Sequence, residues 1–168
     1  MTAMQARVHP PLACVLLLIA PLALGAQSGR AASIPADFSA FLDVVDAAQV
    51  ELQNGRPAAY KALWSRRDDI TLSGGFGGTI EKGWEAIDRR LDWVATQFSN
   101  GTTRIERFVS NVSGGLGYVV QAEHVRYRVP GAASDSTRDY RVTMIFRRET
   151  GRWRMVHRQA DSQTIRLP

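Results

Sequence analysis

A predicted β-hairpin near the C-terminal end of the chain constrains the fold most strongly. The segment Arg141–Gln163 holds two apolar-rich runs on either side of Thr150-Gly151, a dipeptide typical of a tight turn. Side chains alternate along a strand, so the second run is expected to place five residues on one face: Trp153, Met155, His157, Gln159 and Asp161. That face is apolar at the turn end and polar at the other. We therefore expect it to form one wall of a pocket.

The N-terminal residues have the pattern of a secretory signal peptide. Arg7 and His9 precede the apolar run Leu12–Leu24, and small residues follow it. The run is well short of the ~20 residues that span a membrane, and an uncleaved anchor is the alternative interpretation. Cleavage after Gly25 and cleavage after Ala31 both fit the pattern.

We therefore divide the chain into a leader, 1–31, and one domain, 32–168. The leader predicts a periplasmic or secreted protein without membrane attachment after cleavage. It contains the only cysteine, Cys14, so the mature domain lacks a thiol for disulfides, metal ligation or nucleophilic catalysis. Loss of Arg7 and Arg30 lowers the formal charge from +5 to +3. The remaining basic residues are scattered among acidic ones, which disfavours a nucleic-acid partner.

The mature chain begins with helical spacing and ends with strands. Apolar residues recur at three- and four-residue steps in its first part, and Asn-Gly or Pro residues mark the boundaries. Three helices are expected, from Pro35 to Asn54, from Pro57 to Trp64 and from Gly83 to Asn100. A short strand is expected at Asp69–Ser73, before a glycine-rich bend at Gly74–Gly78.

Four longer strands are expected to form an antiparallel meander: Thr103–Val112, Tyr118–Val129, Asp139–Arg148 and Trp153–Gln163. Helices followed by strands indicate an α+β fold. A curved antiparallel sheet of this length, wrapped over N-terminal helices, would enclose a cone-shaped hollow.

This order of elements and three local motifs resemble the nuclear transport factor 2-like superfamily. The motifs are Asp68–Leu72, Gly83–Ile87 and the closing Gly151–His157, and the resemblance extends from Phe38 to Ser162. Within the superfamily the chain is similar to SnoaL-like domains and to the association domain of calcium/calmodulin-dependent kinases. The resemblance implies a cystatin-like conical roll, a pocket between the first helix and the concave sheet, and a homodimer formed through the convex face. Because the fold carries both enzymes and binding modules, it does not specify a function.

The C-terminal motif departs from its relatives at two positions. Where they have a second histidine and a serine, this chain has Gln159 and Asp161. The departure disfavours roles that need two imidazoles. A pair made of His124 and His157 would lack a third ligand, so neither a metal nor a cofactor is expected.

His157 is the candidate catalytic residue, as a general base oriented by a carboxylate. The alternative is that His157, Gln159 and Asp161 are the hydrogen-bonded polar end of a strand. Four residues along a strand separate His157 from Asp161 by roughly 13 Å. They therefore need Gln159 as a bridge, or partners on another strand.

Arg141 and Thr143 share a face on the preceding strand and would bind an anion if that face were concave. The alternative is a solvated convex face, since the residues alternating with them form a cleaner apolar set. His124 is interpreted as a sheet residue with a hydrogen-bond partner. Both faces of Tyr118–Val129 mix polar and apolar residues, so its concave face stays open.

Three functions fit these observations. The first is a secreted, non-catalytic module that binds a small apolar or amphipathic ligand. The second is a SnoaL-like isomerase, dehydratase or hydrolase that uses His157, and the third is a non-catalytic assembly domain whose pocket is filled. Steroid-type proton transfer is disfavoured, because the acidic positions that the resemblance implies fall at Gly74 and Val142. Aromatic residues expected in the core or the pocket lining are Trp64, Phe76, Trp84, Trp93 and Trp153.

Overall fold

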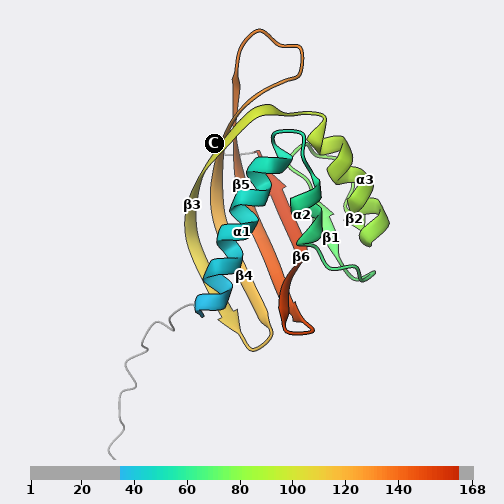
Figure 1. Cartoon of the computed structure of the whole chain (residues 1–168), viewed down its shortest axis with the longest axis vertical. Helices are drawn as coiled ribbons and strands as arrows, with labels where there is room; N and C mark the ends of the chain where they lie inside the picture. Colours follow the sequence, from blue (N-terminus) through green and yellow to red (C-terminus); the bar gives the residue numbers. More distant parts are fainter. Residues whose placement is uncertain (1–34, 163–168) are drawn as a thin grey trace, which may run out of the picture. The chain divides into compact units, whose positions relative to one another are not determined.

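The computed structural model describes residues 35–162, so the predicted leader lies outside the described residues. Helices come first and long strands last, which confirms the predicted α+β fold (Figure 1). The helices are α1 (Ala36–Leu52), α2 (Ala58–Ala62) and α3 (Trp84–Ala95). The strands are β1 (Thr71–Ser73), β2 (Glu81–Lys82), β3 (Ser99–Ser113), β4 (Leu116–Arg128), β5 (Ser136–Glu149) and β6 (Arg152–Asp161).

All six strands form one sheet in the order β2-β1-β6-β5-β4-β3. The four long strands make the predicted antiparallel meander. The short strands extend this meander at one edge: β1 pairs with β6 in parallel, and β2 pairs with β1 antiparallel. The parallel pairing brings the segment before the glycine-rich bend beside the last strand of the chain, which local patterning did not predict.

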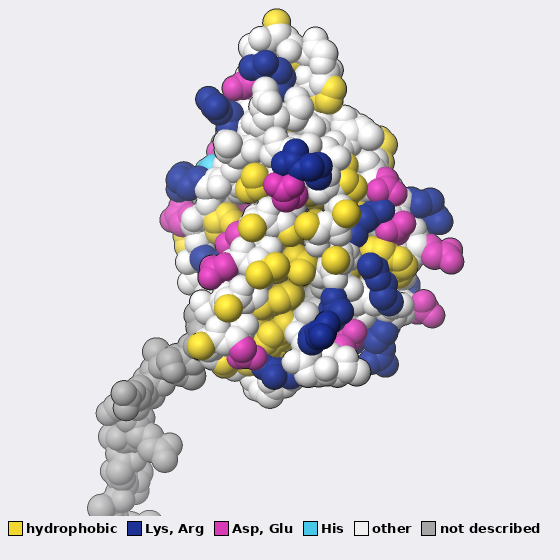
Figure 2. All heavy atoms as spheres, in the orientation of Figure 1, with side chains coloured by type: hydrophobic (Ala, Val, Ile, Leu, Met, Phe, Trp, Pro, Cys, Tyr) yellow, Lys and Arg dark blue, Asp and Glu magenta, His cyan; other side chains and the backbone are white. Residues whose placement is uncertain are grey.

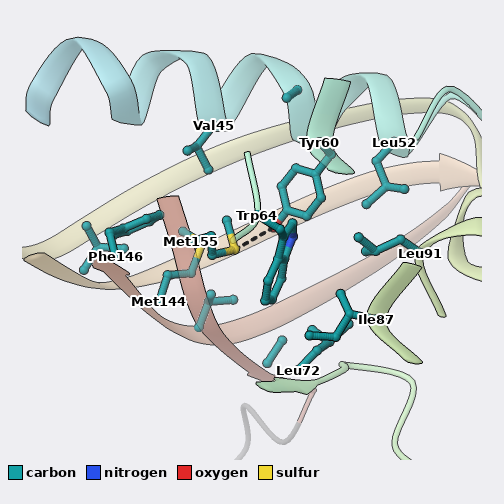
Figure 3. Packing of buried hydrophobic residues seen from close by; sticks show 14 of the residues in the cluster. Val45, Leu52, Tyr60, Trp64, Leu72, Ile87, Leu91, Met144, Phe146 and Met155 are labelled. Atoms are coloured by element: carbon teal, nitrogen blue, oxygen red, sulfur yellow. Dashed lines mark hydrogen bonds between the residues drawn. The ribbon is translucent and has the colours of Figure 1, made fainter. Parts of the chain in front are cut away.

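Helix α1 packs against one face of the curved sheet, here called the inner face (Figure 1). Phe38 on α1 lies over Phe146 of β5, with ring centroids 5.5 Å apart. Apolar side chains from α1, α2, α3 and the inner face form a single core, part of which is shown in Figure 3. In that view the Tyr60 hydroxyl donates to the sulfur of Met155 at 3.8 Å.

The turn between β5 and β6 adopts the geometry that its sequence predicts. Thr150 and Gly151 have φ values of 46° and 81°, as a type I′ hairpin turn requires of both central residues. Farther along the hairpin the pairing is irregular. Phe146 pairs with Met155, but Ile145 pairs with His157, so Val156 is an extra, bulged residue.

No helix within residues 35–162 is long and apolar enough to span a membrane. Figure 2 shows basic and acidic side chains interspersed on the viewed face, with hydrophobic side chains gathered along its middle.

Candidate functional site

A cavity of about 70 Å³ lies between the helices and the inner face of the sheet. Its apolar lining comes from both helices and strands: Leu52, Leu72, Phe76, Leu91, Val94, Phe98 and Ala160. Its polar lining includes Gln49, Gln53, Tyr60, Glu123, Tyr140 and Arg158. We call four partly exposed residues of this lining, Gly74, Gly75, Phe76 and Arg90, the rim. This volume is far below the roughly 300 Å³ at the lower end for sites of drug-sized ligands.

A buried ion pair forms the polar wall of the cavity. Arg158 donates from both terminal nitrogens to Glu123, at 2.9 Å to Oε1 and 2.7 Å to Oε2. The carboxylate also accepts from Gln121 Nε2 at 2.8 Å and from Gln49 Nε2 at 2.6 Å. Burial alone would raise the pKa of Glu123, but the Arg158 charge and these hydrogen bonds hold it below its ordinary value of 4.5. Glu123 is therefore an ionised, fully bonded carboxylate.

The polar network continues from the cavity toward α1 and β3. Gln121 Oε1 accepts from Arg107 Nε at 3.1 Å, and Arg107 Nη2 contacts both carboxylate oxygens of Asp46 at 2.9 Å. Burial raises the pKa of Asp46, although Arg107 opposes the shift. Each charge near Glu123 thus has a partner of opposite sign, and the network joins α1, β3, β4 and β6.

The bulge at Val156 divides the residues predicted to share one face of the last strand. Trp153 and Met155, before the bulge, are buried on the inner face. After the bulge the alternation is reversed, so Arg158 and Ala160 line the cavity. His157, Gln159 and Asp161 are consequently on the opposite, outer face, which corrects the predicted arrangement.

Residues on the outer face do meet one another, but away from the cavity. Arg141, paired with Asp161 in the sheet register, donates to its carboxylate at 2.7 Å. Thr143 is the neighbour of Gln159 across the same strand pair. His157 Nδ1 lies 2.7 Å from Thr71 Oγ1 on β1. Partial burial lowers the pKa of His157 below 6.5, which favours the neutral imidazole. His157 and Asp161 thus each contact a residue of a different neighbouring strand, rather than each other through Gln159.

The predicted aromatic residues have different surroundings. Trp64 is 1% exposed and belongs to the core, while the guanidinium of Arg66 stacks 3.3 Å from the centroid of the Trp84 ring. Trp153 packs against Phe38, with ring centroids 4.8 Å apart. Phe76 lines the cavity, and its ring centroid is 5.4 Å from that of Trp93. Of the five aromatic candidates, Phe76 is the one that reaches the cavity lining.

The burial pattern of strand β4 shows which face of the segment Tyr118–Val129 packs inward. Val119, Gln121 and Glu123 are buried on the inner face, whereas Tyr118 is exposed on the outer face. His124 shares the outer face, where its Nδ1 lies 2.8 Å from Asp139 Oδ1. This is the hydrogen-bonded sheet residue that the sequence predicted. Within residues 35–162, no group of three or more histidine, cysteine or acidic side chains is placed to hold a metal ion.

Reasoning from the sequence missed Glu123 and Arg158. Glu123 shares a strand face with Val119 and Val125, so the alternation of side chains could have indicated that it is buried. The sequence did not indicate that Arg158 lines the cavity, because a strand without a bulge would place this residue on the outer face. Only the pairing of β5 with β6 reveals the bulge.

Comparisons with known proteins agree with this architecture. The family model described as the SnoaL-like domain matches residues 42–163. The chain belongs to the SnoaL-like domain family. No curated protein matches the sequence.

Solved structures similar to this SnoaL-like domain carry names that refer to different functions. A suggested dehydratase of the nuclear transport factor 2-like family from Streptomyces avermitilis has a TM-score of 0.65 at 12% identity, covering 77% of this chain and 96% of its own. A suggested calcium/calmodulin-dependent kinase II association domain from Xanthomonas campestris has a TM-score of 0.59 at 16% identity, with coverages of 79% and 94%. A ketosteroid isomerase-like protein from Erwinia carotovora atroseptica also has a TM-score of 0.59 at 16% identity, with coverages of 74% and 97%. At these identities the likeness establishes the fold of the SnoaL-like domain.

Proposed function

We propose that this SnoaL-like domain is a binding module for a small amphipathic ligand, which occupies the cavity between α1, α3 and the inner face of the sheet. The main support for this proposal is that Glu123 is ionised and that its oxygens are already hydrogen-bonded within the protein. Among the residues that the structure describes, it is the one carboxylate that lines the cavity, and four hydrogen bonds from Arg158, Gln49 and Gln121 occupy its oxygens. A carboxylate with a lowered pKa and no free lone pair aimed at a substrate is a poor general base.

The other titratable groups of the lining also favour binding over proton transfer. Burial raises the pKa of Tyr60 to about 12, and burial likewise raises that of Tyr140. The catalytic alternative used His157 as its base, but this residue lies on the outer face and its ring contacts Thr71. A base must reach the proton that it removes, and His157 does not line this cavity.

The size of the cavity limits the ligand. A cavity needs roughly 10–15 Å³ of such volume to hold one water molecule, so 70 Å³ suits only a compact apolar group. A larger ligand would have to displace Phe76, which lies between two glycine pairs in the bend 74–78. Its ring packs on Trp93 and Phe98 at centroid distances of 5.4 Å and 5.3 Å. Replacement of Phe76 by Ala is thus expected to admit larger compounds.

The proposal is tested by blocking the cavity. We would titrate the protein with branched four- to six-carbon alcohols, amides and acids and follow ligand signals by NMR. Val94→Phe adds a ring to a residue that lines the cavity and should abolish the binding seen with the unmodified protein. Val129→Phe makes the same change at an exposed position and should leave binding intact. If no compound binds the unmodified protein, or Val94→Phe binds equally well, the proposal fails.

We further propose that the domain acts outside the cytoplasm as a homodimer. The signal-peptide pattern of residues 1–31 supports export. Association through the outer face is supported by its exposed apolar side chains, which include Tyr118, Ile145 and Phe108. A sheet face with several such residues is typical of an interaction site.

A further inference from the structure

The cavity and its rim carry an excess of positive charge. Arg90, Arg158 and Glu123 line them, and the Glu123 charge is offset by Arg158. Arg138 adjoins this group, because its guanidinium lies over the ring of Phe76, 4.7 Å from the centroid. Within residues 35–162, neither Arg90 nor Arg138 has a carboxylate oxygen within the 4.0 Å limit of an ion pair. The guanidinium charges of Arg90, at the rim, and of Arg138, beside it, are therefore not offset by a contacting acid.

Arg90 reaches the rim from α3 and is held there by two contacts. Its Nη2 donates to the carbonyl oxygen of Gly77 at 2.9 Å, and its guanidinium lies 4.4 Å from the centroid of the Trp93 ring. A guanidinium has five N–H donors, and a single protein acceptor is found for Arg90 among the described residues. The remaining donors are available to a ligand, on a side chain that is already oriented.

Arg138 approaches from the sheet side. It lies on β5 opposite Val125, and its Nη1 donates to the Tyr140 hydroxyl at 3.5 Å. Phe76 and Tyr140, the two side chains that it contacts, both line the cavity. Arg90 lies over Trp93 and Arg138 lies over Phe76, and these two rings contact each other with centroids 5.4 Å apart. The two guanidiniums, one from α3 and one from β5, thus lie over neighbouring rings.

We propose that the ligand of this SnoaL-like domain carries a carboxylate or a similarly small anionic group, which Arg90 and Arg138 bind at the rim while the apolar part enters the cavity. The inference rests on the proposed function and specifies the class of ligand. A guanidinium binds a carboxylate through paired, charge-assisted hydrogen bonds. The apolar lining beyond it, with Leu91 and Val94 from the same helix as Arg90, suits a short branched chain.

The test compares two probes of the same shape, isovalerate and its neutral amide isovaleramide, at fixed ionic strength. Hydrogen bonds to charged groups are worth more than neutral ones, so the unmodified protein should bind the acid about tenfold more tightly. Arg90→Gln and Arg138→Gln should each reduce this preference, and the double variant should remove it. The amide should still bind every variant, which shows that the cavity is intact.

Arg89→Gln is the matched control, because Arg89 is the exposed neighbour of Arg90 on the same helix; it should keep the full preference for the acid. Equal binding of acid and amide to the unmodified protein would overturn the inference and leave the binding function standing. A preference that survives in the double variant would also overturn it. Failure of both probes to bind, together with all other compounds of the titration, would instead contradict the proposed function.

Discussion

Glu123 shows how one residue can set the character of a site. Its charge is tolerated in the core because Arg158 binds both oxygens and two glutamine amides complete the arrangement. Removal of one member of such a buried pair leaves an uncompensated charge, whereas replacement of both by apolar residues is often close to neutral. The pair therefore contributes to the polarity of the cavity more than to stability.

This leads to a prediction for a double-mutant cycle. Glu123→Leu and Arg158→Met should each lower the free energy of unfolding by roughly 3–5 kcal/mol. The double variant should be considerably more stable than the sum of these losses implies. Urea denaturation of the four proteins measures the coupling between the residues. Additive losses would show that the ion pair is not an energetic unit.

The pH dependence of stability should reflect the same carboxylate. Its pKa is lower in the folded protein than the ordinary 4.5, so the unfolded chain binds the proton more readily. The stabilising contribution is therefore complete above that value and is lost as the pH falls through the folded-state pKa. Acid titrations should show the unmodified protein losing stability below about pH 4.5, and Glu123→Gln should flatten this part of the curve. Parallel curves of stability against pH for the unmodified protein and Glu123→Gln would contradict the lowered pKa of Glu123 in the folded protein.

Mutation of His157 is expected to have little effect on ligand binding. Because it lies on the outer face and contacts Thr71 rather than the cavity, His157→Ala should leave ligand affinity unchanged within about twofold. Val94→Phe, which blocks the cavity, serves as the positive control. A large loss of affinity in His157→Ala alone would restore the histidine as a site residue.

At the scale of elements, local patterning predicts regular structure well and irregular structure poorly. The Thr150-Gly151 turn and the apolar stripe of α1 follow from spacing and backbone preference, and both occur as expected. The bulge at Val156 depends on which residues of β5 and β6 pair across the hairpin. A shift of one residue exchanges the two faces of a strand, so this single bulge moved His157, Gln159 and Asp161 outside and brought Arg158 inside.

The glycine-rich bend after β1 allows a prediction with a built-in control. A Cβ added at Gly75 would lie 2.2 Å from Cε1 of Tyr140, whereas one at Gly74 would be 3.5 Å from the nearest atom, in Arg90. Gly75→Ala should therefore lower the free energy of unfolding by roughly 1–3 kcal/mol through overpacking. Gly74→Ala should change it by less than about 0.5 kcal/mol. Equal effects in thermal or urea unfolding would contradict the close approach of this bend to Tyr140.

In the molecule as a whole, the two faces of the sheet have different roles. The inner face holds the core and the cavity, and the outer face exposes Tyr118 and Ile145. The sequence was sufficient to predict the α+β roll, because helical and strand spacing and the family motifs agree. It was not sufficient to place the cavity residues, which depend on packing between elements distant in the chain.

The proposed homodimer predicts a change of mass on mutation of the outer face. Tyr118→Glu combined with Ile145→Glu would bring negative charges into an apolar interface and should convert a dimer into a monomer. Light scattering coupled to size-exclusion chromatography measures this, and Val129→Glu is a control at another exposed position. A mass that is monomeric before any mutation would contradict the proposed dimer.

A backbone-amide NMR titration with isovalerate and isovaleramide measures ligand binding in the cavity most directly. If the ligand occupies the cavity, resonances of Leu72, Gly75, Val94 and Ala160 should shift together and saturate with one dissociation constant. Thr143 and Gln159, on the outer face, should shift little. Saturable shifts confined to the outer face, or no shifts with either probe and with every other compound of the titration, would contradict ligand binding in the cavity.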